Sequence, residues 1–144
     1  KPIVSDGRKI MSLKYSDKKM SKSHGEQSYI ALRDEPEAIA KKIKKAVSDE
    51  EGIKNLLKLY TYFGDRAKHQ EMYSRYKAGQ LMNTELKEEL TAAIVDYLAP
   101  IQAKIKYYND HPKDINKMLT DGAKKAQTIA DKNLDKIKKI IGLK

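Results

Sequence analysis

From Asp34 to the end of the chain, hydrophobic residues recur at helical intervals, three, four, seven and eight positions apart. Asp34 is expected to cap the first helix and Pro36 to occupy its first turn. Pro100 should interrupt and kink the longest helix, because proline lacks the backbone donor that a helix needs there. The expected helices lie at residues 34–47, 53–63, 66–77, 84–108, 115–119 and 123–140.

Before Asp34 the pattern changes to that of short strands. Apolar or alternating runs occur at residues 3–4, 9–13 and 28–32, and Asp6-Gly7 and a basic segment separate them. These runs are expected to form the remnant edge of a larger α/β domain. The predicted fold is therefore mainly α, a helical bundle with a small β remnant at its N-terminus.

Composition excludes several kinds of site. The 144 residues include no cysteine, so neither disulfides nor a cysteine-ligated metal is available, and a cytoplasmic location is expected. His24, His69 and His111 share no ligand spacing, so no metal site is expected. There is no apolar run as long as a membrane span and no signal-peptide pattern, which predicts a chain without membrane contact.

The net charge of +10 is concentrated at the two ends of the chain. Residues 1–23 carry seven Lys and Arg against two Asp, and residues 113–144 carry nine Lys against four Asp, whereas the charges between them balance. A basic N-terminal segment suits a nucleotide and a basic C-terminal helix suits a nucleic-acid backbone. Charge alone fits equally well with lysines that only keep the protein soluble.

The strongest candidate for a chemical site follows Lys18, in a stretch with neither helical nor strand periodicity. Its sequence is Lys19-Met20-Ser21-Lys22-Ser23. Ammonium groups, hydroxyls and free backbone N–H groups on a mobile loop can surround a polyphosphate. A solvated basic turn would have the same composition, so the motif by itself leaves both interpretations open.

This motif resembles the second signature of the class I aminoacyl-tRNA synthetases, the loop that closes over the phosphates of ATP. Other parts of the chain resemble bacterial tryptophanyl-tRNA synthetases in the same order, and they fall at residues 8–13, 29–32, 34–37, 39–49, 52–57, 98–102, 122–126 and 141–143. The resemblance covers nearly the whole chain. Tyrosyl enzymes share the class but match the later segments less well.

The chain departs from the family pattern in three places. His24-Gly25-Glu26 stand where the family usually has Asp-Pro-Asn, and the connection between Asp49 and Gly52 is shorter than in many members. The first signature of the class, a His-Ile-Gly-His-like turn, does not occur. The resemblance therefore implies a C-terminal part of such an enzyme, inactive as an isolated 144-residue chain.

By resemblance, residues 1–33 would be the edge of the catalytic nucleotide-binding domain with the ATP loop, and residues 34–144 the helical anticodon-binding domain. Lys19 and Lys22 would be the catalytic lysines. ATP, with Mg²⁺, would contact Ile10, Lys19, Met20, Ser21, Lys22 and Ser23. His24 adjoins this loop and is the one histidine with a case for touching a nucleotide. The loop from Lys19 to Gly25 is expected to be poorly ordered without a nucleotide.

For tRNA, the candidate residues are Lys136, Lys138 and Lys139 of the final basic helix. Tyrosines on the helices could also stack on unpaired bases, but the sequence does not select which. The implied parent enzyme is a homodimeric tryptophan–tRNA ligase that binds tryptophan only with its missing N-terminal part. The alternatives are a free-standing basic helical RNA-binding module without catalysis, or the same region of a tyrosyl-tRNA synthetase.

Overall fold

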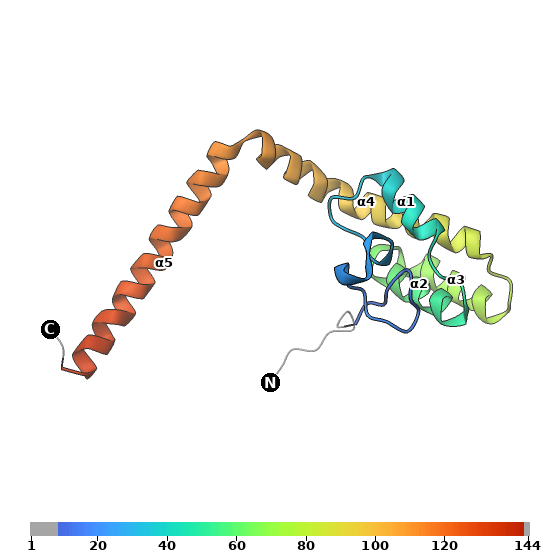
Figure 1. Cartoon of the computed structure of the whole chain (residues 1–144), viewed down its shortest axis with the longest axis horizontal. Helices are drawn as coiled ribbons and strands as arrows, with labels where there is room; N and C mark the ends of the chain where they lie inside the picture. The colour runs from blue at the N-terminus through green and yellow to red at the C-terminus, as the bar shows by residue number, and fades with distance from the viewer. Residues whose placement is uncertain (1–8, 143–144) are drawn as a thin grey trace. The chain divides into compact units, whose positions relative to one another are not determined.

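The computed structural model describes residues 9–142, and across them the fold is mainly α, as predicted (Figure 1). The run at residues 3–4 lies outside this range. The helices are α1 (Pro36–Lys44), α2 (Glu50–Phe63), α3 (Arg66–Lys77), α4 (Asn83–Asp110) and α5 (Pro112–Ile140), and two 3-10 turns precede them, η2 (Lys22–His24) and η3 (Glu26–Ser28). The chain divides into two compact units, residues 1–102 and 103–144, so that α4 contributes to both.

The hydrophobic core of the first unit is built from α1 to α4. One side chain comes from the segment before α1, since Leu13 is buried in the same cluster. The helical residues with the least exposed side chains are Ile39, Ile43, Leu57, Met72, Leu86, Leu90 and Ile94. Each such side chain contributes about 1.5–3 kcal/mol by leaving water. Apolar side chains at helical spacing are therefore buried along α1, along α2 and over residues 86–98 of α4, as predicted, whereas no residue of α4 after Leu98 is buried.

The strands predicted at residues 9–13 and 28–32 are wrong. Across the residues described, the segment before α1 contains one isolated antiparallel bridge, between Met11 and Lys19. The amide of Leu13 also donates to the carbonyl of Ser28 at 3.1 Å, but no ladder continues from this bond. A strand gains its stability from repeated pairing with a neighbour, and these runs pack on helices instead.

The start of α1 differs from the prediction in one residue. Glu35, not Asp34, is at the N-cap position, and it makes no side-chain capping bond, whereas Pro36 does begin the helix. The carboxylate of Asp34 accepts hydrogen bonds from the amide of Ala31 at 2.8 Å and from Lys42 Nζ at 2.6 Å. Asp34 therefore fastens the incoming loop to the body of α1, because a nearly buried lysine offers a stronger partner than the free amides of the first turn.

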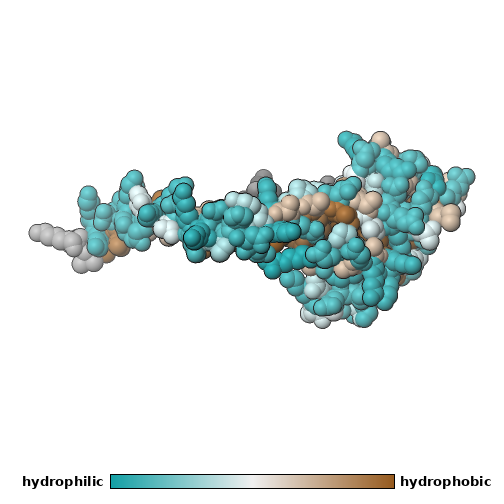
Figure 2. Space-filling model, turned by 90° about the horizontal axis from the view of Figure 1, so that it is seen from above, coloured by the Kyte–Doolittle hydropathy of each residue, from teal (hydrophilic) through white to brown (hydrophobic). Residues whose placement is uncertain are grey.

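In the second unit, α5 is one helix of 29 residues where two were predicted. Gly122 does not end it, because one glycine costs a helix only about 1 kcal/mol. The predicted break at His111-Pro112 is confirmed, whereas α4 continues through Pro100 without interruption. None of the side chains of α5 is buried, and it exposes both apolar and basic groups (Figure 2). No helix in residues 9–142 is long and apolar enough to cross a membrane.

Candidate functional site

The segment before the basic motif folds back on itself as an irregular hairpin. The amide of Ser12 donates to the carbonyl of Lys18, and the amide of Met20 donates to the carbonyl of Ile10, both at 2.9 Å. Ile10 and Met20 are partly buried against the core, so the two ends of the hairpin are fixed side by side. The hairpin therefore places the motif directly beside Ile10.

The motif itself forms a tight turn that its own hydroxyls hold. Ser21 Oγ caps η2 by accepting from the amide of Ser23 at 3.3 Å, and the two serine hydroxyls lie 2.8 Å apart. The amide of Gly25 donates to the carbonyl of Lys22, with φ at +87°, a conformation that favours glycine. Ser28 Oγ lies 2.7 Å from the carbonyl oxygen of Ser21. These bonds leave Lys22 and Ser23 on the exposed side of the turn.

Positive charge gathers on this turn without compensation. The ammonium groups of Lys19 and Lys22 are exposed and make no ion pair with any residue between 9 and 142. Lys18 and Lys14 lie over the ring of Tyr15, at 4.7 and 5.2 Å from its centre. A cluster of lysines that makes no ion pairs with the described residues raises the local concentration of anions such as phosphates.

His24 is the last residue of η2 and contacts Tyr15. Its ring meets that of Tyr15 edge to face, with centres 5.8 Å apart. The Nδ1 atom of His24 is buried and has no hydrogen-bond partner among the described residues. The histidine therefore packs against the tyrosine whose ring Lys14 and Lys18 also contact. Tyr15 was not identified from the sequence, because an isolated tyrosine in a loop gives no signal.

Side chains from α2 fasten the hairpin to the helices. Asn55 Nδ2 donates to the carbonyl of Ser16 at 2.9 Å, and Ser16 Oγ donates to Asp49 Oδ2 at 3.0 Å. Asp49 also caps α2, because its Oδ1 accepts from the amide of Gly52 at 2.6 Å. Asp49 and Asn55 are 33 and 39 positions from Ser16, so no local sequence signal could have identified the contacts. The basic turn is thus mechanically linked to the start of α2.

The candidate tRNA lysines lie in the other compact unit. Lys136, Lys138 and Lys139 occupy the last turns of α5, near the helix C-terminus. Cations are favourable there, because the helix dipole is negative at that end. Helix stability alone would thus account for part of their placement, and their contact with tRNA stays a prediction.

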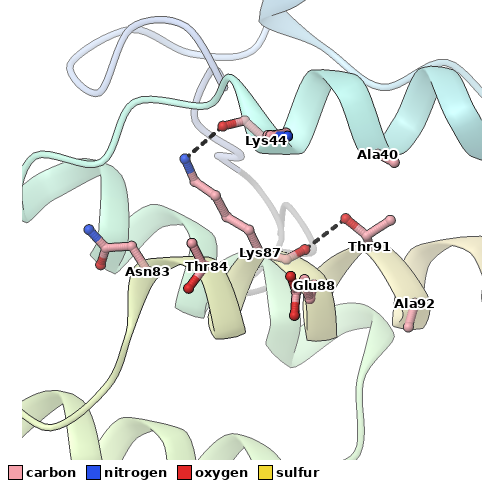
Figure 3. Close-up of a pocket in the computed structure, with 8 residues that line it drawn as sticks. All are labelled: Ala40, Lys44, Asn83, Thr84, Lys87, Glu88, Thr91 and Ala92. Carbon is pink, nitrogen blue, oxygen red and sulfur yellow. Dashed lines mark hydrogen bonds between the residues drawn. The ribbon is translucent and has the colours of Figure 1, made fainter.

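A hollow of about 560 Å³ lies between α1 and α4, away from the basic turn (Figure 3). Its lining consists of Ala40, Lys44, Asn83, Thr84, Lys87, Glu88, Thr91 and Ala92. Lys87 Nζ donates to the carbonyls of Lys44 and Ala46, at 3.0 and 2.8 Å, and burial lowers the pKa of this lysine. Lys87 therefore provides hydrogen-bond donors for carbonyl groups that the end of α1 leaves without a partner, and it joins α1 to α4.

Comparison with known proteins gives consistent results. The family described as "tRNA synthetases class I (W and Y)" matches residues 3–99. The tryptophan–tRNA ligase of Bacillus subtilis is 37% identical over 98% of this chain and 45% of its own length, and that of Agrobacterium fabrum is 36% identical over 93% and 41%. The crystal structure of tryptophanyl-tRNA synthetase from Campylobacter jejuni matches 94% of the chain and 45% of its own, with a TM-score of 0.74 at 25% identity. The chain thus spans less than half the length of these relatives.

Proposed function

Because the chain belongs to the W and Y family of class I tRNA synthetases, we propose that it supplies the ATP loop and the tRNA-binding helices of a tryptophan–tRNA ligase. The observation that carries this proposal is the exposed turn on which Lys19 and Lys22 make no ion pair with any residue between 9 and 142. Tryptophan is proposed in preference to tyrosine because the relatives named above are tryptophan–tRNA ligases. The division of labour between residues 1–33 and 34–144 is part of the proposal.

In the proposed reaction, the carboxylate of tryptophan attacks the α-phosphorus of ATP and pyrophosphate leaves. Negative charge on the leaving oxygens grows toward the transition state. Lys19 and Lys22 stabilise that charge more strongly than they bind the ground state, which is the difference that accelerates a reaction. Ser21 and Ser23 shape the turn that carries both lysines, and the backbone of Ile10 and Met20 lies beside the adenine.

Mg²⁺ enters this proposal bound to the triphosphate. Across residues 9–142, no group of three or more His, Asp or Glu side chains is close enough together to hold a metal ion. Mg²⁺ in nucleotide sites commonly uses phosphate oxygens and waters as ligands, with few protein carboxylates. The two lysines are then this chain's contribution to the charge around the triphosphate, and phosphate oxygens and waters supply most of the Mg²⁺ ligands.

For the transfer of tryptophan to tRNA, we propose that α5 contacts the tRNA backbone through Lys136, Lys138 and Lys139. Their exposed ammonium groups are spread over about half of the circumference of the helix, and such groups can neutralise phosphates of a nucleic-acid backbone. Tryptophan itself would bind in a part of the ligase outside this chain. A cytoplasmic location, expected from the absence of cysteine, and a homodimeric ligase, expected from the resemblance, belong to the same proposal.

The test is tryptophan-dependent exchange of pyrophosphate into ATP. A complete ligase that contains this chain should exchange with tryptophan and not with tyrosine. The 144-residue chain alone should fold and show no exchange, since activation requires two substrates oriented together. Exchange that depends on tyrosine would show that the ligase is a tyrosyl enzyme. Exchange by the purified 144-residue chain alone would contradict the proposal that this chain is an inactive part of the ligase.

A further inference from the structure

One buried hydroxyl contacts both ends of the basic turn. Ser28 is fully buried, whereas η2, the turn that it contacts, has no buried residue. The hydroxyl of Ser28 can donate to the carbonyl of Ser21 at 2.7 Å or to that of Gly25 at 2.6 Å, and its single proton serves one of them at a time. Ser21 is the N-cap of η2 and Gly25 is its C-cap. A single side chain therefore contacts both ends of the turn that carries Lys22.

The backbone of Ser28 is held by the core. Its carbonyl accepts from the amide of Leu13 at 3.1 Å, and the carbonyl of Leu13 accepts from the amide of Val47 at 2.9 Å. Leu13 itself is buried and belongs to the hydrophobic cluster of the first unit. Ser28 therefore links a fixed part of the protein to a turn at its surface.

The two carbonyls do not depend on this hydroxyl for a hydrogen-bond partner. The carbonyl of Ser21 also accepts from the amide of His24 at 3.3 Å, and the carbonyl of Gly25 also accepts from the amide of Ser28 at 3.0 Å. Removal of the hydroxyl thus leaves neither carbonyl without a donor, so the large cost of a buried unsatisfied group does not arise. What is lost is the contact that fixes both ends of η2 relative to the core.

We propose that Ser28 is a positioning residue for amino-acid activation and that it acts through Lys22. Its hydroxyl fixes η2 against the core, and η2 in turn places the ammonium group of Lys22 beside the departing pyrophosphate. Lys22 is exposed and makes no ion pair with any residue between 9 and 142, so its position depends on the backbone of η2.

The expected size of the effect follows from the need for preorganised charge. A group that stabilises a transition state must already be in place, and a displacement of about 1 Å can cost about a hundredfold in rate. The inference rests on the proposed function, because it takes Lys22 to stabilise the charge on pyrophosphate.

Single-turnover formation of tryptophanyl adenylate by a complete ligase that contains this chain tests the inference. For Ser28→Ala, we expect a rate about ten- to a hundredfold lower, with ATP affinity and the urea midpoint nearly unchanged. Ser48→Ala is the matched control, because it also removes a serine hydroxyl that donates to a carbonyl, that of Ala46 at 3.1 Å, outside the basic turn. The control should keep the wild-type rate.

A double-mutant cycle separates positioning from a general structural role. If Ser28 acts through Lys22, Ser28→Ala should lower the rate of the Lys22→Ala ligase by less than about twofold, because the group that it positions is absent. Additive losses in the cycle would overturn the inference. If Ser28→Ala does not fold, Ser28→Cys decides, since a thiol occupies the site but is a weak donor, and the same losses are expected. A wild-type rate for that variant would also overturn the inference.

Failure of the inference and failure of the proposed function give different results. A slow Lys22→Ala ligase together with a wild-type rate for Ser28→Ala would overturn the inference alone. A wild-type rate for Lys22→Ala would contradict the proposed role of that lysine, and the inference with it.

Discussion

Lys87 joins α4 to the end of α1 through hydrogen bonds to two carbonyls. Lys87→Met keeps most of the aliphatic stem and removes both bonds. We expect the free energy of unfolding to fall by roughly 1.5–3 kcal/mol, the value of hydrogen bonds from a charged donor, measured by urea denaturation. Lys132→Met on α5 is the control and should change it little. An unaltered urea midpoint for Lys87→Met would contradict this role.

The same lysine predicts a pH dependence. Burial lowers the pKa of Lys87 in the folded protein below its usual 10.5, so the unfolded chain binds the proton more tightly. Stability should therefore rise as pH increases from the lowered pKa toward 10.5, and Lys87→Met should lack this part of the rise. Urea midpoints for both proteins across that alkaline range measure the effect. Parallel pH curves would show that Lys87 is not the group responsible.

At the residue scale, the sequence singled out the candidate lysines, but it did not reveal the residues that hold their loop in place. Lys19 and Lys22 follow from a five-residue motif that can be read directly from the sequence. Asn55 and Asp49 hold the same loop through Ser16, but they become its neighbours only when α2 packs beside the hairpin. Asp34 has the right chemistry for a cap, and the position of Lys42 decided its actual partner.

The contact between the hairpin and α2 gives a prediction at the scale of elements. Asn55→Ala removes the bond to the carbonyl of Ser16. We expect amide hydrogen exchange to become about two- to tenfold faster in residues 13–24, because one hydrogen bond contributes roughly 0.5–1.5 kcal/mol. Exchange in α3 serves as the internal control and should not change. Unchanged exchange in the hairpin would mean that its internal bonds hold it without α2.

The basic end of α5 gives the second prediction at this scale. Lys136→Gln, Lys138→Gln and Lys139→Gln together should weaken tRNA binding and reduce its log–log salt slope by roughly 0.7–0.9 for each phosphate that is no longer neutralised. Preference for the cognate tRNA should change far less, because phosphate contacts carry no sequence information. The matched triple variant at Lys104, Lys106 and Lys113 should keep most of the slope. If only that control lowers the slope, the tRNA contacts residues around the junction of α4 and α5 instead of the end of α5.

Helices were predictable from the sequence where the spacing of apolar residues alone determines them. The amphipathic spacing of α1, α2 and α4 produced the observed buried faces. The two short strands were predicted from apolar runs, but a run becomes a strand only with a partner, and residues 9–142 supply one bridge. Pro100 was given too much weight as a breaker and the helices at residues 115–119 and 123–140 were predicted as separate, although helices of 28 and 29 residues tolerate one unfavourable position each.

At the scale of the whole molecule, the two kinds of basic surface fall in different compact units. The turn with Lys19 and Lys22 belongs to the first unit and the lysines of α5 to the second. The proposed ligase uses the first in amino-acid activation and the second in holding tRNA. Substitutions on the turn should therefore leave tRNA binding unchanged, and substitutions on α5 should leave amino-acid activation unchanged. The relatives are more than twice as long as this chain, so the tryptophan pocket can lie in another part of the ligase.

The central claim is that Lys22 stabilises the departing pyrophosphate. Single-turnover formation of tryptophanyl adenylate by a complete ligase that contains this chain measures it most directly. For Lys22→Ala, we predict a rate about a hundred- to a thousandfold lower, with a much smaller change in ATP affinity, while the exposed control Lys41→Ala keeps both. An unchanged rate, or a fall in affinity as large as the fall in rate, would contradict this role for the loop.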